Sequence, residues 1–333
     1  MANSNKRIIY LSPAKLNLGL KIEGKYYDPT RKIYGYHNLH TTFCLIDLFD
    51  EIEIWLNNTN NISIIDHQQA WFYQKDLAYK AAALLREYTN TQYGVNIKIK
   101  KVIPSGSGLG GGSSNAATVL LALNDLWQLN LDNITLLNLA SKLGADVAFF
   151  VYGRNAIATG IGDVFVETDI PEYYFVIVVP DFHLSTKAVF DTYDKINASI
   201  NYFDNINIPN SSNVNNVTTN TNNAHTSNNS RYYNEEMLNN ISLIKEQSQQ
   251  IKVQFTNDLQ VSAMVLQKKL LDIFNELKSY GNPSLTGSGS AVFLTYNDKQ
   301  IAKKVAKDLS LRYNTYLTSR LLNSPLFNNS SLK

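Results

Sequence analysis

The stretch 95–129 constrains the fold more than any other part of the chain. Apolar and polar residues alternate over 95–100, which predicts a half-buried β-strand. The loop 105–115 is almost entirely glycine and serine, and an alanine- and leucine-rich run at helical spacing continues from Ser113. We expect Ser113 or Ser114 to cap that helix. A glycine loop at a helix N-terminus presents unpaired N–H donors and the positive end of the helix dipole, so it predicts a phosphate-binding site.

Other interpretations of this glycine loop can be weighed on the sequence. Gly106, Gly108 and Gly111 fit the dinucleotide fingerprint, but that fold needs a second strand after the helix, and another helical run follows instead. A Walker loop is excluded because no Gly-Lys-Ser or Gly-Lys-Thr closes the motif. A flexible linker would have neither the strand before it nor the helix after it. A phosphate loop is therefore the preferred interpretation.

Composition restricts the class of protein. The length of 333 residues suits two domains, and a net charge of +2 gives no reason to expect nucleic acid or an anionic membrane as partner. The single cysteine, Cys44, excludes an intrachain disulfide. The apolar run 173–179 is too short to cross a bilayer, and the first residues lack the pattern of a signal segment. We therefore expect a cytoplasmic protein.

Two positions outside the glycine loop carry candidate catalytic groups. Lys15 and Asn17 alternate with leucines, so both project from one face of a predicted strand, although a solvated edge strand would give the same pattern. Asp146 follows a glycine and stands among alanine, valine and phenylalanine. That setting predicts a partly desolvated carboxylate for which Lys15 could supply the cation, while an aspartate after glycine is also typical of a helix N-cap.

Periodicity and turn residues predict the other elements. We expect strands at 41–46, 52–56, 62–65, 173–179 and 292–296, a hairpin over 154–168 turning at 160–163, and helices at 75–88, 134–143, from Ser185, from Glu235 and at 299–312. A loop is expected at 28–35. The segment 205–230 is dominated by Asn, Ser and Thr, which predicts a disordered, mobile surface insertion.

The motif 104–114, a proline followed by glycines and serines, resembles the phosphate loop of the GHMP kinases, the superfamily of galactokinase, homoserine kinase and mevalonate kinase. Three further motifs are similar to those of the branch that phosphorylates a cytidine-diphosphate methylerythritol: 13–18, the Gly-Tyr-His triplet at 35–37, and 144–150. The segment 285–291 resembles the third GHMP motif. This chain departs from the family pattern at Asn115, where Asp is usual, and at Ala148, where Pro is usual.

The resemblance implies an α+β fold with two domains: a mixed-sheet ATP-binding domain at 1–171 and a ferredoxin-like domain at 172–333. It implies ATP-dependent phosphorylation of the 2-hydroxyl of the cytidine-diphosphate methylerythritol, in the non-mevalonate route to isoprenoids, with Mg²⁺ as a second cofactor. The implied partners are these two small molecules, without nucleic acid or membrane, in a monomer or weak homodimer.

The same resemblance implies a role for individual residues. Asp146 would accept the hydroxyl proton beside Lys15, and Ser114 would ligate Mg²⁺. Tyr36 would stack on the cytosine opposite Phe190, and His37 would hydrogen-bond the edge of the base. The residues implied for ATP are Pro104, Gly106, Gly108, Leu109, Gly110, Gly111, Gly112, Ser113 and Ser114. Those implied for the substrate are Asn17, Tyr36, His37, Thr186, Phe190, Gly287 and Gly289.

Two other functions stay open on the sequence. Another GHMP kinase, of the homoserine or mevalonate type, would share the glycine loops but would have no need of the triplet 35–37. A non-catalytic, nucleotide-binding sensor of the same fold would keep the glycine loops but would not need Lys15 and Asp146. Both residues are present, which argues against the sensor.

Overall fold

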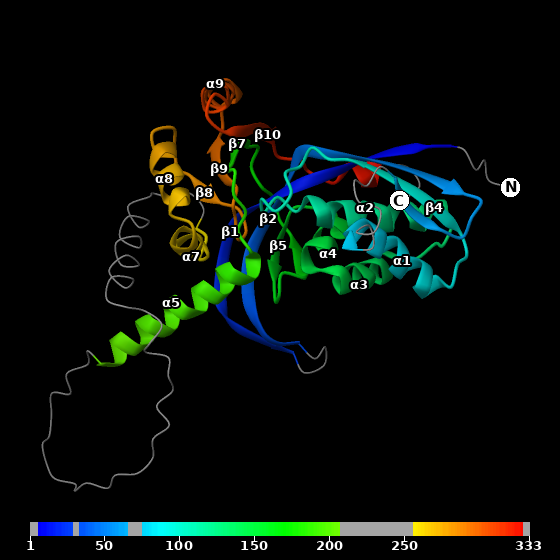
Figure 1. Cartoon of the computed structure of the whole chain (residues 1–333), viewed down its shortest axis with the longest axis horizontal. Coiled ribbons are helices and arrows are strands. Elements are labelled where there is room, and N and C mark those ends of the chain that lie inside the picture. Colours follow the sequence, from blue (N-terminus) through cyan, green and yellow to red (C-terminus); the bar gives the residue numbers. More distant parts are fainter. Residues whose placement is uncertain (1–5, 29–32, 66–74, 207–255, 329–333) are drawn as a thin grey trace, which may run out of the picture.

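A computed structural model describes residues 6–28, 33–65, 75–206 and 256–328. Its strands form two sheets, with helices packed on each, and Figure 1 shows the two groups of elements side by side. Within the described residues, no helix combines the length and the apolarity needed to cross a membrane.

The first sheet is built on a long antiparallel ribbon of two strands. β1 (Ile8–Asp28) pairs with β2 (Ile33–Asn57). β2 also lies in the middle of the rest of the sheet, whose strand order is β3-β4-β2-β5-β6. These are β3 (Ile62–Ile65), β4 (Gly94–Lys100), β5 (Ala156–Thr159) and β6 (Val164–Glu167). The sheet is mixed, as expected, because β3 runs parallel to β4 and the other pairs are antiparallel.

Four helices cover the first sheet and bury its apolar face. They are α1 (Leu77–Thr89), α2 (Gly111–Leu126), α3 (Asn133–Leu143) and α4 (Ala145–Tyr152). Their buried residues form one cluster with Ile54 and Ile97 of the sheet, and Phe149 of α4 stacks on Phe43 of β2 with ring centroids 4.5 Å apart. α2 is buried almost all round, which fixes the helix that follows the glycine loop.

The second sheet has the ferredoxin-like topology that the resemblance implies. Strand, helices, two strands, helix and strand follow one another along the chain, and the antiparallel order is β10-β7-β9-β8. The strands are β7 (Tyr174–Val179), β8 (Ser284–Leu285), β9 (Val292–Tyr296) and β10 (Asn314–Ser319). The helices are α5 (Thr186–Ile206), α7 (Gln260–Leu266), α8 (Lys268–Leu277) and α9 (Lys299–Leu309), and a short 3₁₀ helix, η3 (Pro325–Asn328), follows β10.

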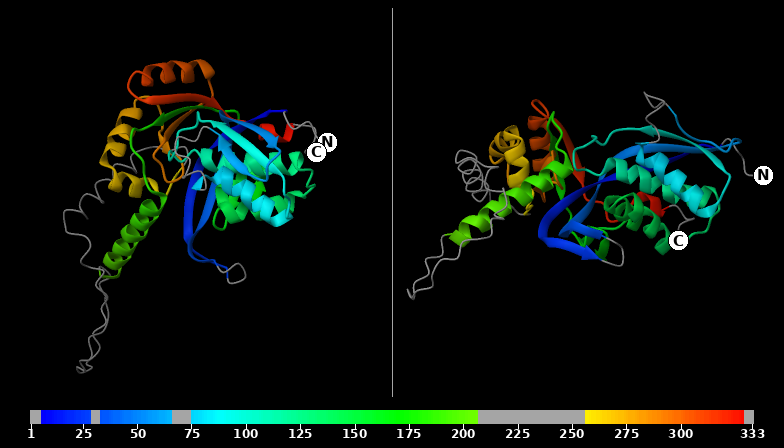
Figure 2. Two further views of the ribbon diagram at one scale, coloured as in Figure 1. Left: turned by 45° about the vertical axis from the view of Figure 1, so that its right-hand side comes forward. Right: turned by 60° about the horizontal axis from the view of Figure 1, so that its bottom comes forward.

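β7 is buried on both faces, as its apolar run predicts. Val176 and Val178 pack in a cluster with residues of α7, α8 and α9, whereas Phe175 and Ile177 pack in another with Leu16 and other residues of the β1–β2 ribbon. The second sheet therefore rests on the first through an apolar layer, and the further views in Figure 2 show the ribbon running between the two groups of helices.

The structure corrects several boundaries. β2 is one strand where two, at 41–46 and 52–56, were expected, because its pairing with β1 resumes on both sides of a register shift between Ile46 and Phe49. Gly35 belongs to this strand rather than to a loop 28–35. α9 ends at Leu309, short of the expected 312, because the chain turns there to enter β10.

Some predictions fall on residues that the structure does not describe. Within 205–230, α5 includes residues 205 and 206, so the insertion cannot begin before 207, and its remainder lies outside the described residues. The helix expected from Glu235 also lies outside them. The domain boundary at 171/172 stays a prediction; β6 ends at Glu167 and β7 begins at Tyr174.

Candidate active site

The glycine loop adopts a conformation that only glycine accommodates easily. Gly108 and Gly110 have φ of +84° and +75°, in the left-handed region. A Cβ at Gly108 would lie 2.6 Å from the carbonyl oxygen of Thr286, and Ala291 N donates to Ser107 O at 3.0 Å. The first glycine loop thus packs backbone to backbone on the second, 285–291, which joins the two sheets at this point.

The expected helix cap is wrong. Gly110 is the N-cap of α2, and its carbonyl accepts from Ser114 N at 2.9 Å, so Ser113 and Ser114 lie inside the first turn. Ser114 is completely buried, and its Oγ lies 2.7 Å from Ser12 Oγ, which also lies 2.9 Å from Asn115 Oδ1. Because no side chain caps the helix, its first N–H groups stay available to a ligand.

The α2 N-terminus opens into a cavity of about 690 Å³. Its lining combines apolar side chains with the glycine loop and with charged side chains. The apolar residues are Ile64, Ile65, Leu77 and Ile99. The loop and charged residues are Pro104, Ser105, Gly106, Ser107, Gly108, Gly110, Gly111, Gly112, Ser113, Asn115, Asp76, Lys101 and Asp146. A cavity that offers both apolar side chains and a helix N-terminus suits a nucleotide, whose base is apolar and whose phosphates are anionic.

Lys15 and Asp146 meet at this cavity, from strand β1 and from the first turn of α4. Lys15 Nζ lies 3.6 Å from Asp146 Oδ2 and donates to Asn17 Oδ1 at 2.6 Å. The Lys15 side chain is 4% exposed, so it does not lie on a solvated strand face, whereas Asp146 is 40% exposed. Asp146 is not the helix N-cap either, because Gly144 occupies that position. A buried ammonium beside an accessible carboxylate is an arrangement suited to proton and phosphoryl transfer.

The second glycine loop approaches the same pair. A Cβ at Gly287 would lie 3.2 Å from Asn17 Oδ1 and 3.7 Å from Lys15 Nζ. Asn257 Nδ2 donates to the carbonyls of Leu285 and Gly287, at 2.9 and 2.8 Å, which holds this loop in place. Asn257 therefore helps to shape the site. A Cβ at Gly289 would point toward Leu285 and Leu184, and the carbonyl oxygen of Gly289 faces Gly108.

Sequence reasoning missed Asp50 and Lys101. Asp50 is completely buried on β2, opposite Ser12 of β1 and next to Glu51, where the pairing of β2 with β4 ends, and its Oδ1 accepts from the backbone N–H groups of Val102 and Ile103 at 2.7 and 2.8 Å. Its Oδ2 pairs with Lys101 Nζ, which lines the cavity. This carboxylate fixes the segment between β4 and the glycine loop. The signal in the sequence that could have revealed Asp50 was the presence of an aspartate inside an apolar strand pattern.

We expect Asp50→Ala to lower the free energy of unfolding by about 1–3 kcal/mol, because it leaves two backbone N–H groups without an acceptor. Glu51→Ala is the matched control, since Glu51 pairs with Lys100 on the surface, with side chains 42% and 67% exposed; it should change that free energy by less than about 1 kcal/mol. Urea denaturation of both variants checks the difference. Equal losses would show that Asp50 does not anchor the loop.

The residues expected at the base lie on β2 and α5. His37 stacks on Phe190, with ring centroids 4.7 Å apart and planes inclined by 30°. Tyr36, the next residue along β2, is 60% exposed. The structure thus brings Phe190 to His37, and the stacking of Tyr36 across a base from Phe190 stays a prediction. Thr186, at the start of α5, is hydrogen-bonded to Ser288 of the second glycine loop at 2.9 Å.

Comparison with known proteins gives consistent matches over the chain. The model for the GHMP kinases N terminal domain matches residues 76–154, and that for the GHMP kinases C terminal matches residues 236–315. The chain is 35% identical over 326 residues to a 4-diphosphocytidyl-2-C-methyl-D-erythritol kinase of Neisseria meningitidis serogroup A, covering 98% of this chain and 99% of the relative. A protein of the same name from Chromobacterium violaceum is 34% identical over 324 residues, covering 96% and 97%.

Solved structures agree with these matches. A crystal structure of 4-(cytidine 5'-diphospho)-2C-methyl-D-erythritol kinase superposes with a TM-score of 0.67 at 27% identity, covering 94% of this chain and 99% of that one. Homoserine kinase from Cytophaga hutchinsonii superposes with a TM-score of 0.61 at 16% identity, covering 97% of both chains. At that identity the second likeness shows the fold alone.

Proposed function

This chain belongs to the 4-diphosphocytidyl-2-C-methyl-D-erythritol kinases, a family of GHMP kinases, and from that premise we propose that it transfers the γ-phosphate of ATP to the 2-hydroxyl of 4-diphosphocytidyl-2-C-methyl-D-erythritol. The reaction belongs to the non-mevalonate route to isoprenoid precursors. The observation that carries the proposal is the Lys15–Asp146 pair, 3.6 Å apart, at the glycine-loop cavity. A cytoplasmic location and a monomer or weak homodimer stay predictions.

The chemistry divides between the two members of this pair. Asp146, 40% exposed, accepts the proton of the attacking hydroxyl, which is the task of a general base. Lys15 places its ammonium where negative charge develops on the transferring phosphoryl group. Asn17 holds that ammonium through the 2.6 Å hydrogen bond to Oδ1, and Thr41 Oγ1 in turn accepts from Asn17 Nδ2 at 2.8 Å. The position of the cation is therefore fixed before the substrate arrives.

ATP is held by the cavity at the start of α2. Backbone N–H groups of the glycine loop and the positive end of the α2 dipole bind its phosphates, and Lys101 adds a cation at the cavity wall. The apolar residues of the same cavity, among them Ile64 and Leu77, cover the base. Ser113 lines this cavity, whereas Ser114 is buried behind it.

Mg²⁺ bound with ATP would neutralise charge on the phosphates. Among the described residues, no cluster of three or more His, Cys, Asp or Glu side chains could hold a metal. The carboxylates of Asp76 and Asp146 line the cavity, and Mg²⁺ needs only one or two carboxylates when phosphates supply other ligands, so the site fits the ion. Ser114 is a poor ligand as placed, because its hydroxyl is buried against Ser12.

A coupled assay of ADP release tests this function. The purified chain is given ATP, Mg²⁺ and one alcohol at a time: 4-diphosphocytidyl-2-C-methyl-D-erythritol, mevalonate or homoserine. We expect turnover with the first only. Turnover with mevalonate or homoserine instead would make this another GHMP kinase, and binding of ATP without turnover of any alcohol would favour a sensor.

The role proposed for Tyr36 predicts a selective loss of substrate binding. Tyr36→Ala should raise the KM for the cytidine substrate roughly ten- to a hundredfold, because a stacked base is worth about 1–3 kcal/mol. The KM for ATP should barely change. Tyr34→Ala is the control, since Tyr34 lies two residues earlier on β2 and is similarly exposed, at 54% against 60%. Equal loss of both substrates would contradict the stacking role.

A further inference from the structure

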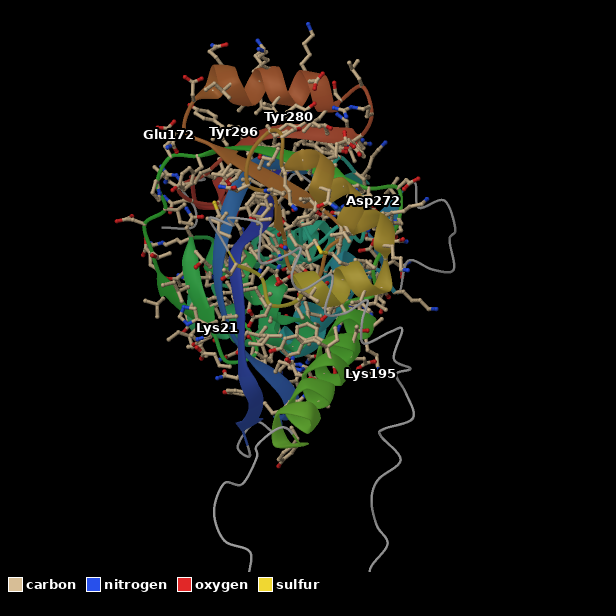
Figure 3. The ribbon with its side chains drawn as sticks, turned by 90° about the vertical axis from the view of Figure 1, so that its left-hand side faces the viewer. Lys21, Glu172, Lys195, Asp272, Tyr280 and Tyr296 are labelled. Carbon is tan, nitrogen blue, oxygen red and sulfur yellow. The ribbon has the colours of Figure 1, made fainter. Side chains whose placement is uncertain are left out.

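Three polar side chains from two parts of the fold meet beside the residues expected to bind the base. His37 Nε2 of β2 lies 2.7 Å from Asp194 Oδ1 of α5, and Lys25 Nζ of β1 lies 2.6 Å from Asp194 Oδ2. Lys25 Nζ also lies 3.0 Å from His37 Nε2. Figure 3 shows α5, which bears the labelled Lys195, beside the ribbon that bears the labelled Lys21. The contacts tie the β1–β2 ribbon to the helix of Phe190.

The charges of this cluster decide which ring nitrogen of His37 carries hydrogen. Burial by itself raises the pKa of Asp194, but hydrogen bonds from Lys25 and His37 outweigh it, so the pKa of this carboxyl lies below its usual value. An ionised carboxylate only accepts and an ammonium only donates. One N–H of the Lys25 ammonium donates to Asp194 Oδ2, and the ionised Oδ1, 2.7 Å from His37 Nε2, can only accept, so Nε2 carries the hydrogen. In a neutral imidazole, Nδ1 is then left as an acceptor.

Packing holds the ring in this position. His37 is stacked on Phe190, and Tyr193 presents its ring edge at a centroid distance of 5.9 Å. The His37 side chain is only 11% exposed. A 180° flip of the ring would keep the stack but would place a carbon instead of Nε2 at Asp194 Oδ1, so the bond to Asp194 fixes which ring edge faces α5.

We propose that Asp194 is a specificity-determining positioning residue: by accepting from His37 Nε2, it makes Nδ1 an acceptor for the exocyclic amino group of cytosine. Uracil carries a carbonyl oxygen at that position and would face Nδ1 as a second acceptor. The site would thereby select cytidine over uridine diphosphates. This inference rests on the proposed function, which places cytosine at His37.

Lys25 makes the proposal sharply testable. In Asp194→Ala the carboxylate is gone and the ammonium of Lys25 becomes the nearest partner of Nε2. Because an ammonium only donates, Nε2 must accept from it, and the hydrogen of the ring moves to Nδ1. Nδ1 would then be a donor, which suits the uracil carbonyl better than the cytosine amino group. One substitution should therefore change the base preference as well as the affinity.

The experiment measures the Kd of CDP and of UDP by calorimetry for the full chain. Wild type should prefer CDP, and Asp194→Ala should lower the ratio of the two affinities roughly ten- to a hundredfold, the discrimination typical of hydrogen bonds to a base edge. Asp194→Asn keeps an acceptor and should stay close to wild type. Asp191→Ala is the matched control, because Asp191 lies on the same helix and pairs with Lys187 on the surface, with side chains 50% and 84% exposed.

A second readout reports the tautomer directly. Nitrogen-15 NMR of the imidazole, assigned with His37→Gln, should show hydrogen on Nε2 in wild type and on Nδ1 in Asp194→Ala. Adding Lys25→Met to Asp194→Ala should restore part of the preference for CDP, because no ammonium then opposes hydrogen on Nε2.

Either of two results overturns the proposal: an unchanged CDP to UDP ratio in a folded Asp194→Ala, or hydrogen on Nδ1 of His37 in wild type. These results are distinct from failure of the proposed function. That function fails if wild type does not phosphorylate 4-diphosphocytidyl-2-C-methyl-D-erythritol, whereas here wild type turns the substrate over and only the origin of base selection is wrong.

Discussion

Asp146→Asn is expected to lower kcat about 10²–10⁴-fold, the usual range for losing a general base. The amide keeps the shape of the carboxylate but accepts a proton far less readily, and Asp146 is accessible from the cavity, so both substrates should still bind. Steady-state kinetics with ATP and the cytidine substrate check the split between kcat and KM. Asp125→Asn, an exposed aspartate of α2, is the control and should leave kcat unchanged.

Lys15→Met extends this test to the other member of the pair. Since Lys15 and Asp146 lie 3.6 Å apart and are proposed to serve one step, the double variant should lose much less than the product of the two single losses. Losses in kcat that multiply would show that the two residues act independently. An Asp146→Asn enzyme with full kcat would leave Lys15 and positioning as the sources of catalysis.

Gly108→Ala is expected to remove ATP-dependent activity and to lower the free energy of unfolding by about 2–5 kcal/mol. The left-handed backbone at φ +84° costs a residue with a Cβ about 1–2 kcal/mol. The new Cβ would also lie 2.6 Å from Thr286 O and 3.1 Å from Gly289 O, and relieving such overlap costs about 1–3 kcal/mol more. The two glycine loops would have to separate, which displaces the second loop from Lys15.

Gly112→Ala is the matched control for this substitution. Gly112 lies in the first turn of α2 without a positive φ, and the nearest atom to its Cβ would be Leu77 Cδ1 at 3.9 Å. Its free energy of unfolding should stay equal or rise by up to about 1 kcal/mol, since alanine favours the helix. Urea denaturation separates the two variants, and a Gly108→Ala protein as stable as Gly112→Ala would contradict the packing argument.

Much of the fold could be predicted because periodicity is a local property of the chain. The alternation over 95–100 gave β4, and the apolar run at 173–179 gave a strand buried on both faces. The hairpin turning at 160–163 formed between β5 and β6 as expected. The predicted ends of some helices and strands were wrong. The N-cap of α2 is an example, because Gly110 takes a left-handed conformation there and Ser113 and Ser114 lie inside the helix.

The sequence by itself determined the types of most elements, because backbone sterics and side-chain periodicity act within a few residues, and its motifs indicated the family. The catalytic roles of Lys15 and Asp146 stay predictions. Only the tertiary structure decided which side chains meet. The contacts of Lys15 with Asp146, of Asp50 with the segment before the glycine loop, and of His37 with Asp194 join residues far apart in the chain. Such distances depend on strand register and helix packing, to which every residue of both sheets contributes.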